Sequence, residues 1–274
     1  MQGVTHPKGA LAAGILPPMA NGSGHIALEH VDKRFAGGLL ALREVSLRVG
    51  PGEFVALLGP SGCGKSTVLR LAAGLDSASA GTVDAPALRG GDAATAFVFQ
   101  EPTLMPWASV FDNVWLPLRL AGVTRPLAEG RVLTMLGNVG LGEFASAYPA
   151  ELSGGMKMRA SIARALVTQP SVLLMDEPFA ALDEITRSRL NADLLAWWAA
   201  RQLSVLFVTH SVYEAVFLSQ RVLVMSPRPG RIVAEVRIDQ PYPRDATFRT
   251  SASYLAACRD VSDALEAAQA QALA

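Results

Sequence analysis

Short apolar runs alternate with longer helix-like segments over most of this chain. Runs typical of strands buried on both faces occur at 54–58, 96–99, 171–175, 205–208 and 222–225. The last three runs are separated by segments long enough for a helix. Strands and helical segments repeated in this order predict a parallel α/β fold.

Residues 1–24 lack this pattern. Lys8 and the apolar residues after it imitate a short signal peptide, but two prolines and a Gly/Ser-rich stretch follow without a clean cleavage site. We therefore expect a disordered tail. The folded part is expected to begin at residue 25, because β-rich runs follow at 26–31 and 45–49.

Tryptophans, prolines and helix-like pieces replace the alternating pattern between Gln100 and Glu151. Residues 127–139 form the clearest predicted helix of this stretch. We interpret residues 101–155 as an inserted helical subdomain.

The C-terminal segment 241–274 predicts one further helix. Tyr254, Cys258, Val261 and Leu265 recur at spacings of three or four residues, which places them on one helical face. We expect this extension to pack that face against the core.

The composition narrows the classes of function. Lys plus Arg and Asp plus Glu number 24 each, so the formal net charge is zero, which argues against a chain that mainly binds nucleic acid or anionic lipid. The apolar fraction is 50% and the charged fraction only 18%, so we expect some apolar surface to meet a partner. No run of about 18 apolar residues occurs, so the chain itself is not expected to span a membrane. Two cysteines cannot form a disulfide framework, which favours the reducing cytosol.

A phosphate-binding motif lies between the apolar run 54–58 and a predicted helix. Residues 59–66 match G-x-x-x-x-G-K-[ST] in the required strand–loop–helix context. Backbone N–H groups and the helix N-terminus attract phosphate oxygens, Lys65 supplies a charge for the β- and γ-phosphates, and Ser66 offers an oxygen to Mg²⁺. A nucleoside triphosphate is therefore the expected ligand. The expected contacts are Gly59, Pro60, Ser61, Gly62, Cys63, Gly64, Lys65, Ser66 and Thr67.

Two carboxylates, Asp176 and Glu177, end the apolar run 171–175. Open α/β sheets bind ligands at the carboxyl ends of their strands. Asp176 is suited to hold Mg²⁺, directly or through water, and Glu177 to polarise the water that attacks the γ-phosphate. A solvated pair of loop carboxylates is the alternative, which the neighbouring phosphate motif disfavours.

A second loop with a serine and two glycines, at residues 153–155, also leads into a predicted helix. With this loop the chain resembles the ATP-binding cassette (ABC) family over residues 26–235. The resemblance implies a P-loop NTPase (RecA-like) α/β core with an N-terminal antiparallel β subdomain and an inserted α-helical subdomain. It places the ATP-binding domain at 25–240 and ATP with Mg²⁺ as its ligands.

The resemblance also assigns roles to single residues. It implies that two copies pair head to tail, each lending Ser153, Gly154 and Gly155 to the γ-phosphate held by Lys65 of the other. Four further positions match family motifs. The resemblance implies that Phe35 stacks on adenine and that Gln100 binds Mg²⁺ and the attacking water. It implies that Asp183 lines the dimer contact and that His210 reaches the γ-phosphate. The expected metal contacts are thus Ser66, Gln100 and Asp176, and the expected catalytic residues are Lys65, Gln100, Glu177 and His210.

Several positions depart from the family pattern. Phe35 replaces the commoner tyrosine, which keeps the stacking face but leaves the preference for adenine over guanine open. Met156 replaces a glutamine and Ala180 a serine, without removing a site residue. Cys63 lies near a helix start, where a thiolate is favoured and oxidation would block nucleotide binding. We prefer the interpretation that Cys63 is simply a small, tolerated residue.

Residues 176–186 and 226–231 are similar to the ATPase subunits of bacterial importers for nitrate, sulfonate, taurine, bicarbonate or thiamine-precursor pyrimidines. Such a subunit works on the cytoplasmic face of the membrane with a transmembrane permease, a second ATPase subunit, most simply another copy, and indirectly an external solute-binding protein. Large apolar residues at 101–107 and 110–115 suit permease docking, or alternatively fill the helical subdomain's core. The sequence leaves the solute undetermined.

Three other functions compete with this interpretation. A non-transport ABC protein acting as an ATP-driven clamp on ribosomes or DNA usually carries a second cassette, coiled coils or basic arms, none of which occurs here. A small-molecule kinase leaves residues 152–155 and His210 unexplained. A regulatory module without turnover would not need Glu177 and His210.

Overall fold

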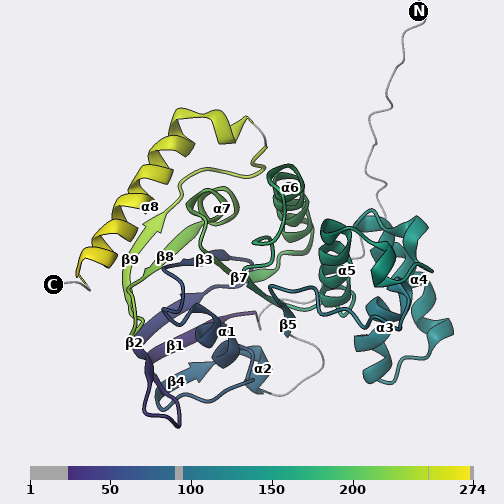
Figure 1. Ribbon diagram of the computed structural model, residues 1–274, viewed down its shortest axis with the longest axis horizontal. Helices are drawn as coiled ribbons and strands as arrows, with labels where there is room; N and C mark the ends of the chain where they lie inside the picture. Colours follow the sequence, from purple (N-terminus) through teal and green to yellow (C-terminus); the bar gives the residue numbers. More distant parts are fainter. Residues whose placement is uncertain (1–23, 90–94, 246, 272–274) are drawn as a thin grey trace, which may run out of the picture.

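A six-stranded sheet forms the centre of the computed structural model, which describes residues 24–89, 95–245 and 247–271 (Figure 1). The strands run in the order β5-β6-β7-β3-β8-β9. Their bounds are β3 (Phe54–Leu58), β5 (Thr95–Val98), β6 (Val172–Asp176), β7 (Ser204–Thr209), β8 (Arg221–Met225) and β9 (Ile232–Arg237). All pairings are parallel except that of β9 with β8. The predicted parallel α/β core is thus confirmed.

Every residue of β3 is buried because helices or strands cover both faces of this sheet. Phe54, Ala56 and Leu58 belong to one core, which they share with helices that follow β5 in the sequence. Val55 and Leu57 belong to a second core, which they share with α1 (Lys65–Ala72) and with apolar residues of the segment 26–49. Alternate residues of a strand face opposite sides. The sequence of a strand that is buried on both faces is therefore an unbroken run of apolar residues.

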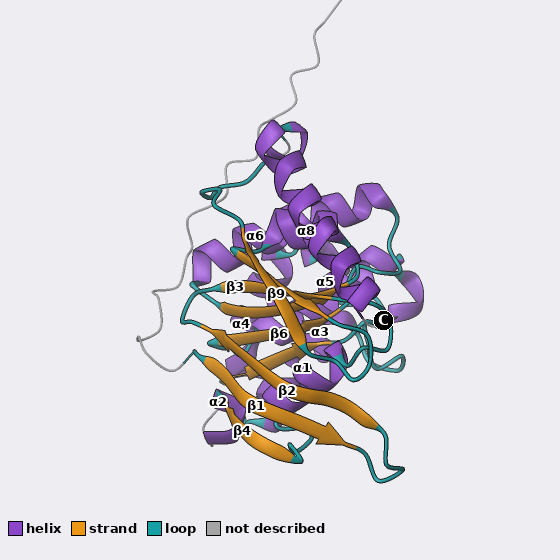
Figure 2. Ribbon diagram, turned by 90° about the vertical axis from the view of Figure 1, so that its left-hand side faces the viewer, coloured by secondary structure: helices purple, strands orange, loops and turns teal. Residues whose placement is uncertain are grey.

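A second, antiparallel sheet lies against the first across the core that contains α1 (Figure 2). Its strands are β1 (Ile26–Arg34), β2 (Leu40–Val49) and β4 (Ala80–Asp84), in the order β2-β1-β4, and the short helix α2 (Pro86–Arg89) follows β4. The structure thus contains the antiparallel sheet that the family resemblance implied. Of the expected tail 1–24, only Gly24 falls within the described residues.

Helices replace strands between β5 and β6 and project to one side of the molecule (Figure 1). They are α3 (Val110–Leu120), α4 (Arg125–Asn138), two 3-10 turns (Gly142–Phe144 and Pro149–Glu151) and α5 (Gly154–Leu166). The expected apolar docking surface at 101–115 is only partly exposed. Trp107 is 76% exposed, but Val110 and Phe111 are buried inside this helical segment. Half-buried Trp115 donates its indole N–H to the Val123 carbonyl at 3.1 Å.

The last helices complete one face of the central sheet. They are α6 (Glu184–Arg201), α7 (Val212–Leu218) and α8 (Ala252–Gln271), with a 3-10 turn (Phe248–Thr250) before α8. Tyr254, Cys258 and Val261 of α8 are buried in the core, as their spacing predicts. Within the described residues, no helix combines the length and apolarity needed to cross a bilayer.

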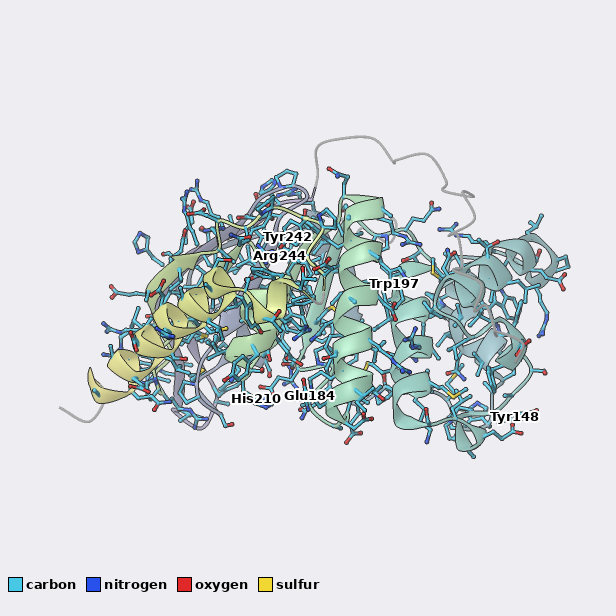
Figure 3. All side chains as sticks on the ribbon, turned by 90° about the horizontal axis from the view of Figure 1, so that it is seen from above. Tyr148, Glu184, Trp197, His210, Tyr242 and Arg244 are labelled. Carbon is cyan, nitrogen blue, oxygen red and sulfur yellow. The ribbon has the colours of Figure 1, made fainter. Side chains whose placement is uncertain are left out.

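One buried arginine fastens the segment before α8 to the end of α7. Arg244 is 5% exposed and lies beside Tyr242 (Figure 3), with its guanidinium carbon 4.2 Å from the ring centroid. Its Nη1 donates to the carbonyls of Val216, Phe217 and Ser219 at 2.8 to 3.1 Å. The last carbonyls of a helix lack partners within the helix. Arg244 therefore supplies hydrogen bonds that the C-terminus of α7 needs.

Candidate functional site

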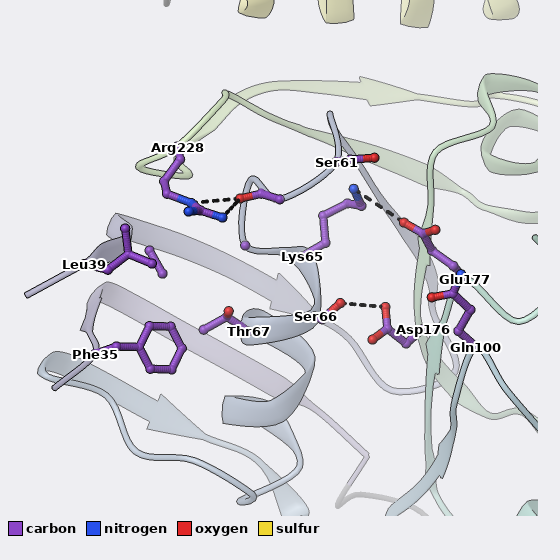
Figure 4. A pocket seen from close by; sticks show the side chains of 13 residues that line it. Phe35, Leu39, Ser61, Lys65, Ser66, Thr67, Gln100, Asp176, Glu177 and Arg228 are labelled. Carbon is purple, nitrogen blue, oxygen red and sulfur yellow. Dashed lines mark hydrogen bonds and ion pairs between the residues drawn. The ribbon is translucent and has the colours of Figure 1, made fainter. Parts of the chain in front are cut away.

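A cavity of about 400 Å³ opens where β3 and β6 end (Figure 4). It brings together most of the predicted site residues, although they are spread over much of the chain. The lining residues are Phe35, Leu39, Ala41, Ser61, Gly62, Gly64, Lys65, Ser66, Thr67, Gln100, Asp176, Glu177 and Arg228.

The phosphate loop, residues 59–66, leads from β3 into α1. Gly64 has φ of 110°, and a Cβ there would lie 2.6 Å from Leu42, so this position requires glycine. Lys65 is 4% exposed, and its Nζ donates to the carbonyls of Gly59 at 2.8 Å and Pro60 at 3.0 Å. The loop thus holds its own ammonium group beside the cavity.

The two predicted carboxylates lie at the end of β6, where Asp176 is its last residue and Glu177 follows it, on the opposite side of the cavity. Ser66 Oγ donates to Asp176 Oδ1 at 3.0 Å. Burial raises the pKa of Asp176, and the negative charge of Glu177 adds to this shift, although the bond from Ser66 opposes it. Two like charges are therefore held close together beside a hydroxyl oxygen.

Glu177 lies between the phosphate loop and His210. Its Oε1 is 3.6 Å from Lys65 Nζ, and its Oε2 is 3.1 Å from His210 Nδ1. Its backbone has φ of 44°, an uncommon value for a residue other than glycine, and its N–H donates to the Val208 carbonyl at 2.9 Å. Backbone strain of this kind is typical of functional sites.

Gln100 and Phe35 mark opposite ends of the cavity (Figure 4). Gln100 follows β5 and lies beside Asp176 and Glu177. Phe35 follows β1, is 38% exposed, and has Lys33 Nζ 5.1 Å from its ring centroid. The aromatic end is thus separated from the carboxylate end by the phosphate loop.

The loop 153–155 and Asp183 do not line this cavity. Ser153 begins α5, accepting from the Met156 N–H at 3.3 Å, and a Cβ on Gly155 would lie 2.5 Å from Thr186 of α6. Asp183 begins α6 and accepts from the Thr186 N–H at 3.0 Å. Ser153, Gly154 and Asp183 are thus exposed outside this cavity, whereas Gly155 is buried.

Cys63 is a buried residue of the phosphate loop. Its side chain is 1% exposed and packs beneath Gly59, and burial raises the pKa of its thiol. Burial outweighs the neighbouring charge of Lys65, which lowers this pKa. Burial therefore favours the interpretation of Cys63 as a small, tolerated residue over that of an oxidation-sensitive thiolate.

Three residues that sequence reasoning missed contribute to this region. Arg228 lines the cavity, although the run 226–231 suggested only a family branch. Buried Glu214 accepts from Thr209 Oγ1 at 2.5 Å and lies 3.6 Å from Arg187 Nε. Arg187 in turn donates to the Leu182 carbonyl at 2.8 Å, which links the segment before Asp183 to the end of β7. Only Glu214, a charged residue within the apolar sequence of α7, carried a signal in the sequence, because Arg228 lies in a loop and Arg187 in a polar part of α6.

The raised pKa of Asp176 makes its charge a cost to the stability of the nucleotide-free protein. A carboxyl whose pKa is higher in the folded chain keeps more protons when folded, so the free energy of unfolding falls as pH rises between the unfolded and the folded pKa. Asp176→Asn removes this charge. We expect the variant to melt a few degrees above wild type at pH 7, and the difference to shrink at acidic pH, in melts followed by circular dichroism.

Asp183→Asn is the matched control for this experiment. Hydrogen bonds from Thr186 lower the pKa of exposed Asp183, so its charge favours the folded state above the pKa of the unfolded chain. Asp183→Asn should melt no higher than wild type at pH 7. An Asp176→Asn variant that melts at or below wild type at pH 7 would contradict the conclusion that the charge of Asp176 destabilises the nucleotide-free protein.

Comparison with protein families identifies the family of this chain. The model of the ABC transporter family matches residues 42–180. The chain belongs to this family. The predicted family is thereby confirmed, and with it the predicted ATPase activity.

Curated relatives of this ABC ATPase include import ATP-binding proteins. The taurine import ATP-binding protein TauB of Rhizobium johnstonii is 50% identical over 208 residues, which cover 75% of this chain and 79% of the relative. The nitrate import ATP-binding protein NrtD of Synechocystis sp. is 44% identical over 234 residues, 82% of this chain and 88% of the relative. The predicted resemblance to the nitrate, sulfonate and taurine branch is confirmed, and the clamp on ribosomes or DNA is not favoured.

Solved structures agree on the fold. A dimeric ATP-binding cassette in a post-hydrolysis state, bound to ADP and Pi, has a TM-score of 0.69 and 30% sequence identity, covering 79% of this chain and 100% of that one. The cbiO1 structure from Clostridium perfringens, part of an ABC transporter complex, has a TM-score of 0.70 and 26% identity over 78% of this chain and 88% of that one. The predicted P-loop NTPase fold is confirmed.

Proposed function

We propose that this ABC ATPase energises the import of a small solute, of the nitrate, sulfonate, taurine or pyrimidine-precursor type, through a separate permease. The observation that carries this proposal is the convergence of Lys65, Asp176 and Glu177 in one cavity, in a chain similar to import ATP-binding proteins. Its ATP-binding domain spans residues 25–240, and residues 241–274 form a C-terminal extension.

ATP binds across the cavity, with its base at Phe35 and its γ-phosphate toward Glu177. The N–H groups of the phosphate loop and the N-terminus of α1 receive the phosphate oxygens. The Lys65 ammonium, already held beside the cavity by Gly59 and Pro60, pairs with the β- and γ-phosphates. The cavity thus receives the base at its Phe35 end and the phosphates at the end that holds Lys65 and Glu177.

Mg²⁺ fits the oxygen donors at the phosphate end. Ser66, Gln100 and Asp176 offer hydroxyl, amide and carboxylate oxygens, which are the ligands this hard cation prefers. The raised pKa of Asp176 beside Glu177 marks a site where a cation would relieve like-charge repulsion. When bound, the cation supplies charge neutralisation at the phosphate oxygens.

Glu177 polarises the water that attacks the γ-phosphate. Its Oε1 is close to Lys65 and its Oε2 to His210, so both oxygens are oriented before nucleotide arrives. His210 holds Glu177 and faces the γ-phosphate, and Gln100 orients the water from the neighbouring strand. A positioned general base contributes about 10²- to 10⁴-fold to such a step.

A second copy of the chain completes the site. Ser153, Gly154 and Gly155 start α5 and present a helix N-terminus, which attracts an anion, yet they do not line the cavity of their own chain. In a head-to-tail dimer they reach the γ-phosphate held by the partner, and Asp183 lies at the dimer contact. A dimeric cassette among the similar structures supports this arrangement.

The helical segment between β5 and β6 docks the permease. Trp107 and Leu120 are more than three-quarters exposed there, at 76% and 79%, and large exposed apolar side chains favour a protein partner. The subunit therefore works on the inner face of the cell membrane. An external solute-binding protein acts with it only indirectly, and no nucleic acid takes part.

Co-purification from the native host tests this assignment. A tagged chain is recovered from gently solubilised membranes, and its partners are identified by mass spectrometry. We expect a permease with several membrane spans, whose accompanying binding protein would indicate the solute. Recovery only from the soluble fraction with ribosomes or DNA would overturn the importer assignment in favour of a clamp.

Two surface variants sharpen this experiment. Trp107→Asp should lose most of the permease while keeping its ATPase activity, because it alters only the exposed docking surface. Leu75→Asp is the control, since Leu75 is also exposed, at 62%, but follows α1 outside the helical segment. Equal recovery of permease by both variants would remove Trp107 from the docking surface.

A further inference from the structure

The loop between β8 and β9, residues 226–231, is fixed against the phosphate loop. A Cβ on Gly230 would lie 2.1 Å from the Cys63 carbonyl oxygen, so the two backbones are in direct contact. Gly230 N–H donates to the Ala41 carbonyl at 2.9 Å, and its own carbonyl accepts from Arg43 N–H at 3.0 Å. The loop therefore has a defined position between the phosphate loop and β2.

Arg228 extends from this loop to the edge of the cavity. Its Nε and Nη2 donate to the carbonyl of Gly62, at 3.0 and 2.7 Å. A guanidinium has five N–H donors, and those not used here have no acceptor among the described residues. The bonds to Gly62 orient a charged, planar group with free donors beside the cavity.

Arg228 lies at the base end of the cavity rather than at the catalytic end. Figure 4 shows it on the same side as Phe35 and Leu39, with Lys65 and the phosphate loop between it and Glu177. Lys65 already serves the β- and γ-phosphates in the proposed site. An arginine at the other end can stack on a base or donate to the ribose and base edge.

We propose that Arg228 is a nucleotide-binding residue that contacts the ribose and base end of ATP, across the cavity from Phe35, and contributes to affinity rather than to hydrolysis. This inference rests on the proposed nucleotide site. Gly62 preorganises the guanidinium, so that nucleotide gains its contacts without ordering a flexible side chain. Phe35 offers only one face of its ring to the base, because Lys33 Nζ lies over the other face.

Calorimetric titration of the full-length chain with Mg-ATP, Mg-ADP and Mg-tripolyphosphate tests the proposal. Tripolyphosphate presents the phosphates without ribose or base. We expect Arg228→Ala to bind ATP and ADP about 10-fold more weakly than wild type, as for loss of a charged hydrogen bond. Its affinity for tripolyphosphate should remain unchanged, its KM for ATP should rise similarly, and its kcat should stay at the wild-type value.

Two further variants separate this contact from other effects. Arg231→Ala removes the same charge from the same loop, but Arg231 does not line the cavity, so its affinities should match wild type. Arg228→Gln keeps an amide donor for the Gly62 carbonyl, so the loop stays supported while the charge and planar fork are lost. It should bind ATP and ADP weakly like Arg228→Ala, and it provides the test if the alanine variant does not fold.

Each contrary outcome has a distinct meaning. An equal loss for tripolyphosphate would show that Arg228 only supports the phosphate loop, which would overturn the proposal. Unchanged ATP affinity in Arg228→Ala, or an equal loss in Arg231→Ala, would overturn it as well. Failure of the wild-type chain to bind Mg-ATP would instead overturn the proposed nucleotide site itself.

Discussion

Glu177→Gln is expected to bind Mg-ATP, to lose ATP turnover by about 10²- to 10⁴-fold, and to accumulate as a dimer when ATP is present. The amide keeps the size of the carboxylate and can still accept a bond from His210, so the cavity stays intact. It is a far weaker base, however, and the water is no longer activated. In the proposed head-to-tail dimer hydrolysis reopens the closed form, so a closed form that cannot hydrolyse ATP is expected to persist.

Phosphate release and light scattering after size exclusion measure these two effects. Glu143→Gln is the control, since Glu143 is an exposed carboxylate in a 3-10 turn of the helical segment, and its turnover should equal wild type. Turnover by Glu177→Gln at the wild-type rate would remove Glu177 from the role of general base. Loss of Mg-ATP binding would show that the residue supports the phosphate loop instead.

Ser153→Arg is expected to abolish hydrolysis while sparing nucleotide binding by the monomer. The loop 153–155 lies outside the cavity of its own chain, so a bulky cation there leaves Lys65 and its surroundings unchanged. In the proposed dimer the same side chain blocks the γ-phosphate of the partner. The double variant with Glu177→Gln should therefore bind Mg-ATP and remain monomeric.

The loss of a helix cap must be separated from the loss of this contact. Ser153 caps α5, and removing such a cap costs about 1 kcal/mol of stability. Ser109→Arg removes the equivalent cap of α3, so in the Glu177→Gln background it should still form the ATP-dependent dimer. A Ser153→Arg monomer that cannot bind ATP would contradict the head-to-tail site.

Local order along the chain made the phosphate loop predictable. A strand, a glycine loop and a helix follow one another directly, so spacing alone places Lys65 and Ser66 beside a phosphate. The two carboxylates were predictable for the same reason, because they end an apolar strand and parallel strands end at one edge. The hydrogen bond from Ser66 Oγ to Asp176 Oδ1, at 3.0 Å, follows from the same parallel arrangement of strands.

Features that depend on distant segments could not be predicted in this way. β4 has mainly exposed residues and joins its sheet only by pairing with β1, so no apolar period marks it. The segment at 110–115 is apolar in sequence, but only packing decides that Phe111 is buried whereas Trp107 is exposed. Burial likewise raises the pKa of the Cys63 thiol, although its position near a helix start would favour the thiolate.

The sequence by itself determined the fold class, the family and the residues proposed to bind the phosphates, because these follow from contiguous motifs and from apolar periodicity. Tertiary structure alone decided which residues of β3 face each core, since a strand covered on both sides carries no alternation. It also decided the place of Arg228, which reaches Gly62 across 166 positions of sequence. A contact of that kind depends on the path of the chain in three dimensions, and no local sequence pattern predicts it.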